Sequence, residues 1–195
     1  TTKRKIIYKF NFYKKNDKNF EKKLSIILDN EILYVADNFG YVYSIDYKEK
    51  KIIWAKYFKI PFRSNLKISK DKLFLSDQNN TLYVLDKLNG KKLKLIPTEE
   101  VTLKSKFINS IALKDNSLIF LNTFGTIYAI NVNNLKINWF INLNQSLDLS
   151  FNNLFTSNPI LINMTKPRSG LYTVKSKYNA RVAESTKVCV LNRAS

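Results

Sequence analysis

Few residues in this chain of 195 could carry out acid–base, nucleophilic or metal chemistry. The sequence contains no histidine, which excludes Ser-His-Asp and Cys-His catalysis and most zinc sites. The single cysteine, Cys189, has no evident activating neighbour and cannot form a disulfide within the chain. Asp115 and Asp148 lack a partner at the spacing of paired catalytic carboxylates, and no phosphate-binding glycine motif occurs. The sequence therefore predicts a binding protein without catalytic residues, cofactor or metal.

The residues with potential for partner binding lie in turns and connections. Phe39 and Phe124 occupy tight turns, where exposed aromatic side chains can anchor a partner. Packing of each ring onto a neighbouring turn is an equally good interpretation. Glu99 and Glu100 form the only acidic cluster of a basic chain, within an insertion of the kind that often forms a binding face. A loop that only faces solvent is the simpler interpretation of this pair.

A pattern of fourteen residues, present three times, must position these side chains. The copies occupy 33–46, 73–86 and 118–131, so they start 40 and then 45 residues apart. Each consists of two short runs of β-branched and aromatic residues around a polar turn, which predicts a β-hairpin. The turns open with Asp37, Asp77 and Asn122. They end with Gly40, Asn80 and Gly125, residue types that tolerate positive φ.

An apolar segment before and after each hairpin adds two strands to every copy. Four short antiparallel strands in about 40 residues predict one blade of a β-propeller. We expect an all-β fold with three clear four-stranded blades, at about 20–60, 61–100 and 101–145, and a partial blade at 150–163. Three blades and a partial one do not close the usual ring. We therefore expect an incomplete propeller over 1–163, to which a closing strand at 6–12 could add.

Recurring aromatic residues in the repeat are expected in the core. Tyr43, Tyr83 and Tyr128 occupy the same repeat position, which favours packing between blades over a ligand platform. Trp54 and Trp139 have the same interpretation. Residues 164–195 differ from the body because they carry more arginine and lack the blade pattern. This tail is of uncertain origin.

The unit resembles the PQQ-type propeller repeat, in which an apolar strand precedes Asp-x-x-Gly, Leu-Tyr-Ala-Leu-Asp, a turn and a final Trp. The residues that match it are Gly40, Tyr43, Ile45, Asp46 and Trp54, then Leu82, Tyr83, Leu85, Asp86 and Gly90, then Gly125, Tyr128, Ala129, Ile130 and Trp139. The second copy departs from the pattern at Asn80 and Lys94. The resemblance covers about residues 20–163. The family with this repeat includes quinone-dependent dehydrogenases, the outer-membrane assembly lipoprotein BamB and sensor domains of unfolded-protein kinases.

Bare repeats without a catalytic insert are most similar to BamB. That resemblance implies a non-enzymatic protein-interaction scaffold in the periplasm, associated with the outer membrane, whose partner is the barrel assembly machinery. It also singles out Phe62 and Arg63, which match by position an apolar-Arg pair that BamB-like proteins place against their barrel partner. A solvated connector is the alternative for this pair. Open propeller ends could also support self-association.

The charge of the chain suggests a further interpretation of its function. Lysine and arginine number 33 against 15 acidic residues, for a net charge of +18. This charge could serve an adaptor for nucleic acid or an anionic membrane surface, but the lysines are spread along the chain and no nucleic-acid motif accompanies them. A biased composition explains them more simply.

A fragment of a quinone (PQQ)-dependent dehydrogenase is the remaining alternative. No apolar stretch approaches a membrane span, no signal peptide is visible, and the Thr1 start suits a trimmed chain.

Overall fold

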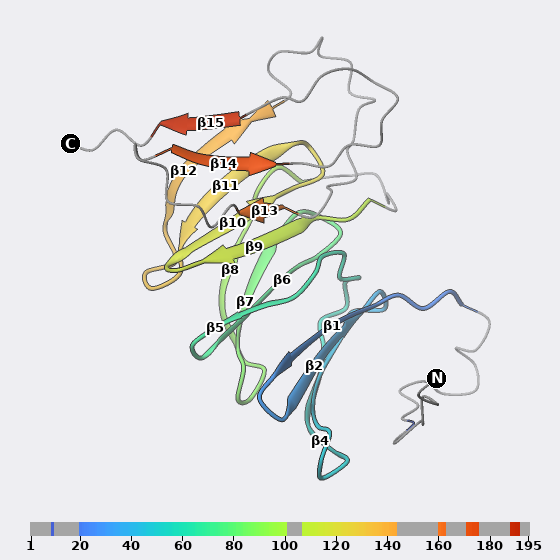
Figure 1. The fold of residues 1–195 in the computed structure, drawn as a ribbon. Helices are drawn as coiled ribbons and strands as arrows, with labels where there is room; N and C mark the ends of the chain where they lie inside the picture. Colours follow the sequence, from blue (N-terminus) through green and yellow to red (C-terminus); the bar gives the residue numbers. More distant parts are fainter. Residues whose placement is uncertain are drawn as a thin grey trace, which may run out of the picture.

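The computed structural model describes residues 9, 20–100, 107–143, 160–162, 171–175 and 188–191. Every regular element in these residues is a β-strand, and the strands form four antiparallel sheets (Figure 1). The predicted all-β propeller class is therefore confirmed. The predicted closing strand at 6–12 lies outside the described residues except for Lys9.

Three of the sheets have four strands each, which hydrogen-bond in chain order. The first sheet comprises β1 (Leu24–Asp29), β2 (Ile32–Asp37), β3 (Tyr41–Asp46) and β4 (Lys51–Tyr57). The second comprises β5 (Lys67–Ser69), β6 (Lys72–Ser76), β7 (Leu82–Asp86) and β8 (Lys92–Ile96). The third comprises β9 (Ser110–Lys114), β10 (Ser117–Leu121), β11 (Thr126–Asn131) and β12 (Ile137–Asn142). These are the three blades that the repeat predicts.

A fourth sheet has three described strands in the order β13-β14-β15. Its first strand, β13 (Leu161–Ile162), falls in the predicted partial blade. Its partners β14 (Leu171–Lys175) and β15 (Val188–Leu191) fall in the tail, for which no blade pattern was predicted. The sheet therefore continues past residue 163, and segments of the tail complete what the blade pattern only begins.

The sheets are arranged side by side in chain order, as Figure 1 shows from β1 to β15. The first strands of the second, third and fourth sheets lie next to one another, since β9 contacts both β5 and β13. The fourth strands β4, β8 and β12 lie at the outside and are mostly exposed. Side chains alternate between the two faces of each strand, so a strand buried on both sides supplies apolar residues to two interfaces.

Each pair of neighbouring sheets encloses a hydrophobic core. Between the first and second sheets, Trp54 and Val42 pack against Leu75 and Tyr83. Between the second and third, Phe74 and Val84 meet Phe120, Tyr128 and others. The third sheet packs on Ile160, with Trp139 partly buried beside it. Tyr83, Tyr128 and Trp54 are thus inter-blade residues, as predicted.

Tyr43 is also buried, but among the described residues its cluster contains only first-sheet side chains, so the predicted packing between blades is not found for this tyrosine.

The three hairpin turns share one hydrogen-bond pattern. Oδ1 of the opening residue accepts two backbone N–H groups, at 3.0 and 2.8 Å for Asp37 and at 2.8 and 2.9 Å for Asp77. Asn122 does the same at 3.1 and 3.0 Å. The closing residue has positive φ each time, including Asn80 at 65°. A short polar side chain that replaces a backbone turn bond explains why the pattern opens with Asp or Asn.

Candidate partner-binding surfaces

All six predicted partner-binding residues lie along one edge of the array. We call it the turn edge, and define it by the hairpin turns 37–40, 77–80 and 122–125 with the connections 58–66 and 97–100. Backbone bonds tie these segments together: Phe62 N donates to Asp37 O at 3.3 Å, and Gln78 N donates to Pro61 O at 2.9 Å. The structure therefore brings together residues that are up to 85 positions apart in the predicted set, from Phe39 to Phe124.

Phe62 lies inside the molecule instead of on the turn edge's surface. Its ring is 6% exposed and makes edge-to-face contacts with Phe58 and Tyr83, at centroid distances of 5.5 and 5.4 Å. The ring therefore offers little surface to a partner, because the connection folds back between the first two sheets. Phe62 can support a partner surface only through the residues that it positions.

Arg63, by contrast, is half-buried on a rigidly held segment. Its N–H donates to Ser76 O at 2.9 Å, and its carbonyl accepts from Asn109 N at 2.7 Å. These bonds fix its backbone between the second and third sheets. Among the described residues, its buried Nε has no hydrogen-bond partner, and neither has the buried Oδ1 of Asn109. A half-buried arginine on a fixed backbone suits a carboxylate ligand.

Glu99 is engaged in a hydrogen-bond network that joins the second sheet to the third. Its carboxylate accepts from Asn122 Nδ2 at 2.6 Å, from Tyr128 Oη at 2.6 Å and from Thr126 Oγ1 at 2.9 Å. Burial opposes ionisation, but the hydrogen bonds from Tyr128, from its own backbone and from Thr126 and Asn122 outweigh it and lower the pKa of Glu99. Burial raises the pKa of Tyr128, and its hydrogen bond to Glu99 raises it further. Glu99 is therefore structural in this arrangement.

Glu100, Phe39 and Phe124 remain nearer the surface. Glu100 is exposed. Phe39 is half-buried and makes an edge-to-face contact with Phe20, at a centroid distance of 6.3 Å. Phe124 is half-buried too. Among the predicted residues, Arg63, Glu100 and parts of the two phenylalanine rings are thus the ones available at the turn edge.

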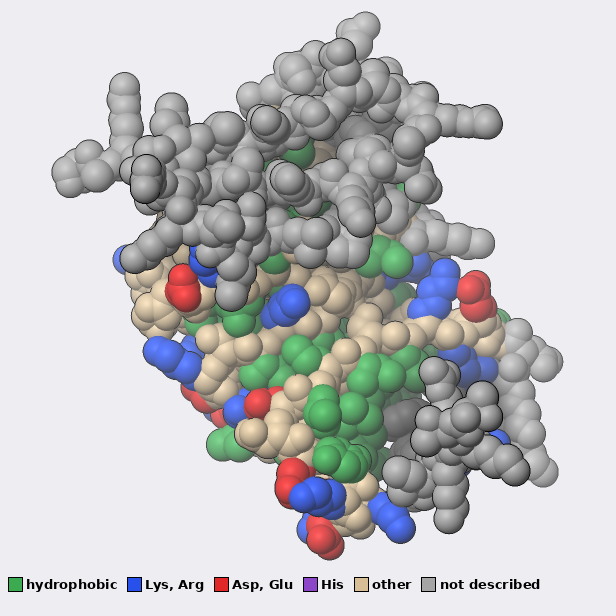
Figure 2. Space-filling model, in the orientation of Figure 1, with side chains coloured by type: hydrophobic (Ala, Val, Ile, Leu, Met, Phe, Trp, Pro, Cys, Tyr) green, Lys and Arg blue, Asp and Glu red, His purple; other side chains and the backbone are tan. Residues whose placement is uncertain are grey.

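An exposed apolar face occurs on the first sheet, away from the second. Leu24, Ile26 and Leu28 alternate along β1 and are 42–56% exposed. Figure 2 shows hydrophobic side chains gathered in the region of this sheet. Tyr41 and Tyr57 lie near its turn edge and stack at a centroid distance of 4.5 Å. An incomplete propeller has open ends, and this face is such an end among the described sheets.

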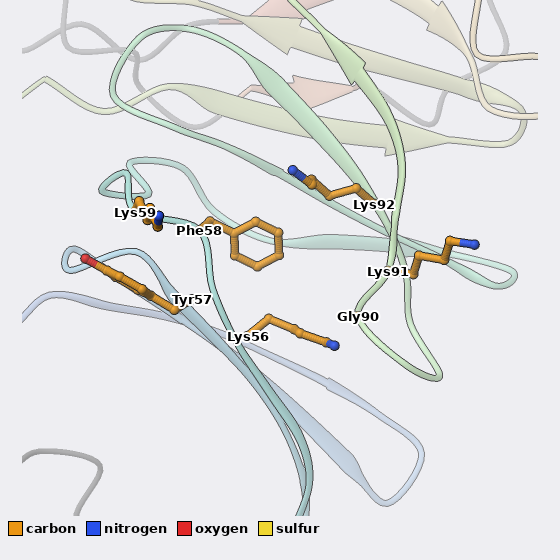
Figure 3. Close-up of a pocket in the computed structure, with 7 residues that line it drawn as sticks. All are labelled: Lys56, Tyr57, Phe58, Lys59, Gly90, Lys91 and Lys92. Carbon is orange, nitrogen blue, oxygen red and sulfur yellow. The ribbon is translucent and has the colours of Figure 1, made fainter.

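A basic groove opens between β4 and the turn before β8, and Figure 3 shows its lining. Its volume is about 360 Å³. The lining residues are Lys56, Tyr57, Phe58, Lys59, Gly90, Lys91 and Lys92. The lysines are spread along the sequence, and their spacing did not predict this cluster. A comparison of charges at equivalent repeat positions, instead of along the chain, would have found it.

The described residues contain no group of three or more His, Cys, Asp or Glu placed to hold a metal ion. They also include no helix of the length and hydropathy needed to cross a membrane.

The repeat, the sheet order and the inter-sheet cores define the chain as a PQQ-type β-propeller. The family model described as outer membrane protein assembly factor BamB matches residues 15–139, and the chain belongs to this family. No curated protein sequence matches the chain.

Solved structures with the same fold share little sequence with the chain. BamB from Moraxella catarrhalis has a TM-score of 0.58 and 14% identity, over 78% of this chain and 42% of that one. The quinohemoprotein alcohol dehydrogenase from Comamonas testosteroni has a TM-score of 0.52 and 17% identity, over 60% of this chain and 20% of that one. A europium-containing methanol dehydrogenase has a TM-score of 0.52 and 16% identity, over 60% of this chain and 24% of that one. The chain thus spans less than half the length of these proteins, and the likeness shows the fold.

Proposed function

We propose that this protein is a non-enzymatic interaction scaffold that acts with the barrel assembly machinery of the outer membrane, in the periplasm. Membership of the BamB family supports this role. The observation that carries it is Arg63, because the segment that holds it is fixed between two sheets while its side chain is only half-buried. A rigid backbone lowers the entropy cost of binding, and a guanidinium can form bidentate hydrogen bonds with a carboxylate.

The turn edge provides the rest of the proposed surface. Glu100 is exposed there, and Phe39 and Phe124 each present part of a ring. Buried Phe62 contributes by packing against Phe58 and Tyr83, which holds the Arg63 segment in place. A surface with aromatic and arginine residues at its centre has the composition of a binding hot spot.

Isothermal titration of the 195-residue chain with the soluble periplasmic region of the barrel component would test this role. We expect saturable binding that Arg63→Ala weakens by at least about tenfold, which corresponds to about 1.4 kcal/mol. Lys51→Ala, which removes an exposed positive charge from β4, is the matched control and should leave the affinity within about twofold. Equal affinity for wild type and Arg63→Ala would exclude the proposed surface.

A titration with PQQ and Ca²⁺ separates the scaffold from the dehydrogenase alternative. We expect no saturable change in the quinone spectrum. Saturable binding with a spectral change would instead favour a dehydrogenase fragment. A nucleic-acid or membrane adaptor would show affinity for DNA or anionic lipid that falls steeply with salt.

A further inference from the structure

We infer that the basic groove between β4 and the turn before β8 binds an acidic segment of a partner protein. This inference deepens the proposed scaffold function, since it adds a second surface and states the chemistry of the segment that occupies it. The groove lies at the outer side of the first two sheets (Figure 3). Arg63 does not line it.

The groove concentrates positive charge that the described part of the protein does not neutralise. Four of its seven lining residues are lysines, and none is acidic. All four, Lys56, Lys59, Lys91 and Lys92, are exposed. The ion pairs found among the described residues use other lysines. Exposed ammonium groups without counter-charges among the described residues raise the local concentration of anions.

The shape of the groove depends on Gly90. Its φ of 69° turns the chain sharply before β8, and a Cβ there would lie 2.7 Å from the ring of Trp54 and 3.0 Å from Cγ of Lys56. The turn therefore lies directly on the indole ring. Tyr57 and Phe58 add aromatic surface, and Figure 3 shows the Phe58 ring between the two sides of the groove. The stems of lysine side chains and these rings offer apolar contact beside the charges.

The repeat itself shows that the lysine cluster is specific to this location. The equivalent groove between the second and third sheets is lined by Leu95, Ile96, Pro97, Leu135 and Ile137, with Lys94 and Lys136. In repeat register, the positions of Lys56, Lys59, Lys91 and Lys92 are occupied by Ile96, Glu99, Lys136 and Ile137. A lysine-rich composition alone would fill both grooves alike. Only the first has four lysines at these positions.

An acidic polypeptide fits this groove better than a membrane or a duplex. A volume of about 360 Å³ is at the small end of ligand sites and accommodates a few side chains. A bilayer surface cannot enter a groove, whereas an extended peptide can place consecutive carboxylates along it. The net charge of +18 would also speed the approach of an acidic partner.

Fluorescence anisotropy with a short fluorescein-labelled Glu-Ser repeat peptide tests the inference. We expect saturable binding to the wild-type chain, no binding of the matched Gln-Ser peptide, and weaker binding as salt rises. The variant K56Q/K92Q should lose about tenfold in affinity. The control K51Q/K136Q removes the same charge from exposed positions on β4 and in the lining of the second groove, and should lose less than about twofold. Thermal unfolding of each variant verifies that it is folded.

Three results would overturn the inference: no binding of the acidic peptide, equal losses in the two double variants, or groove-dependent binding of a DNA oligonucleotide or phosphatidylglycerol vesicles that exceeds binding of the peptide. Equal losses would mean that net charge alone attracts the peptide. The Arg63 titration with the barrel component is independent of these results, because Arg63 lies on the turn edge. The groove and the proposed function can therefore fail separately.

Discussion

At the scale of single residues, the only acidic cluster divides into two different roles. Glu99 and Glu100 are adjacent, yet Glu99 accepts three side-chain hydrogen bonds from the third sheet while Glu100 is exposed. The sequence predicted a shared role because charge alone does not reveal donors that come from 23 to 29 residues further along the chain. The buried network replaces hydration of the carboxylate with fixed donors.

Replacement of Glu99 with Gln should destabilise the fold at neutral pH by about 2 kcal/mol, because hydrogen bonds to a charged acceptor are lost. The lowered pKa of Glu99 adds a pH dependence. The Glu99 carboxylate stabilises the fold fully above the pKa that it has in the unfolded chain. This stabilisation is lost as pH falls through the lower pKa of Glu99 in the folded protein. Urea unfolding curves of wild type and Glu99→Gln should therefore converge in acid.

Glu100→Gln is the matched control for this prediction. It should change the free energy of unfolding by less than about 0.5 kcal/mol, because the side chain is exposed. Equal effects of the two substitutions would show that the Glu99 network adds no stability.

Gly90 and Trp54 form another residue-scale pair. Trp54 Nε1 donates to Lys87 O at 3.0 Å across the sheet interface, and its ring fills the space that a side chain at Gly90 would need. In the next interface the repeat replaces Trp with Lys94 and Gly with Leu135. Lys94 Nζ then donates to Leu135 O at 2.8 Å, so the interface keeps a side-chain bond without the indole ring.

Gly90→Ala should therefore cost about 3 kcal/mol in the free energy of unfolding. About 1 kcal/mol comes from a side chain at positive φ, and the rest from contact with the indole ring. The second part should diminish in a Trp54→Leu background, which a double-mutant cycle by urea unfolding would measure. Purely additive costs would show that the indole contact is not the cause.

At the scale of elements, the hairpin turn explains why its opening residue changes from Asp to Asn. Asp77 uses its Oδ1 for two backbone bonds and is 2% exposed. Burial raises the pKa of Asp77 against the opposing hydrogen bonds from Thr81, Asn79 and Tyr83. Asn122 makes the same backbone bonds, but its Nδ2 also donates to Glu99. A carboxylate at 122 could not donate this bond and would repel Glu99.

The two reciprocal substitutions should consequently behave differently. Asp77→Asn should raise the free energy of unfolding by about 1 kcal/mol at neutral pH, because the buried charge is removed and the turn bonds are kept. The gain should vanish in acid, where the raised pKa leaves Asp77 protonated. Asn122→Asp should lower stability by about 3 kcal/mol, since it removes a donor and adds a like charge. Urea unfolding as a function of pH measures both, and a loss of stability in Asp77→Asn would contradict the turn argument.

The sequence predicts those features of the fold that depend on residues near one another in the chain. Turns such as 37–40, strand alternation and blade spacing depend on residues within about 45 positions, and the three four-stranded sheets appear as predicted. The burial of Phe62 and the engagement of Glu99 depend on contacts between sheets, which a repeat pattern does not specify. Strands β14 and β15 carry no repeat signal, and only pairing with β13 places them in a sheet.

At the scale of the whole molecule, positive charge exceeds what the described structure pairs. The net charge is +18, and four ion pairs occur among the described residues, of which Lys87–Asp29 at 2.8 Å is the most buried. Like charges on a compact chain repel one another, and unfolding relieves the repulsion by increasing their separation. The apolar cores between sheets must therefore stabilise the fold against this term.

Added salt should stabilise the protein by screening that repulsion. We expect the free energy of unfolding to rise by about 1 kcal/mol as NaCl increases from about 20 to about 200 mM, over which the Debye length falls from about 20 to about 7 Å. Urea is the appropriate denaturant because guanidinium is itself a salt. The variant K51E/K136E lowers the net charge by four at exposed positions, so it should be more stable than wild type at low salt and respond less to NaCl. Stability that falls with salt would instead show that attractive ion pairs outweigh the repulsion.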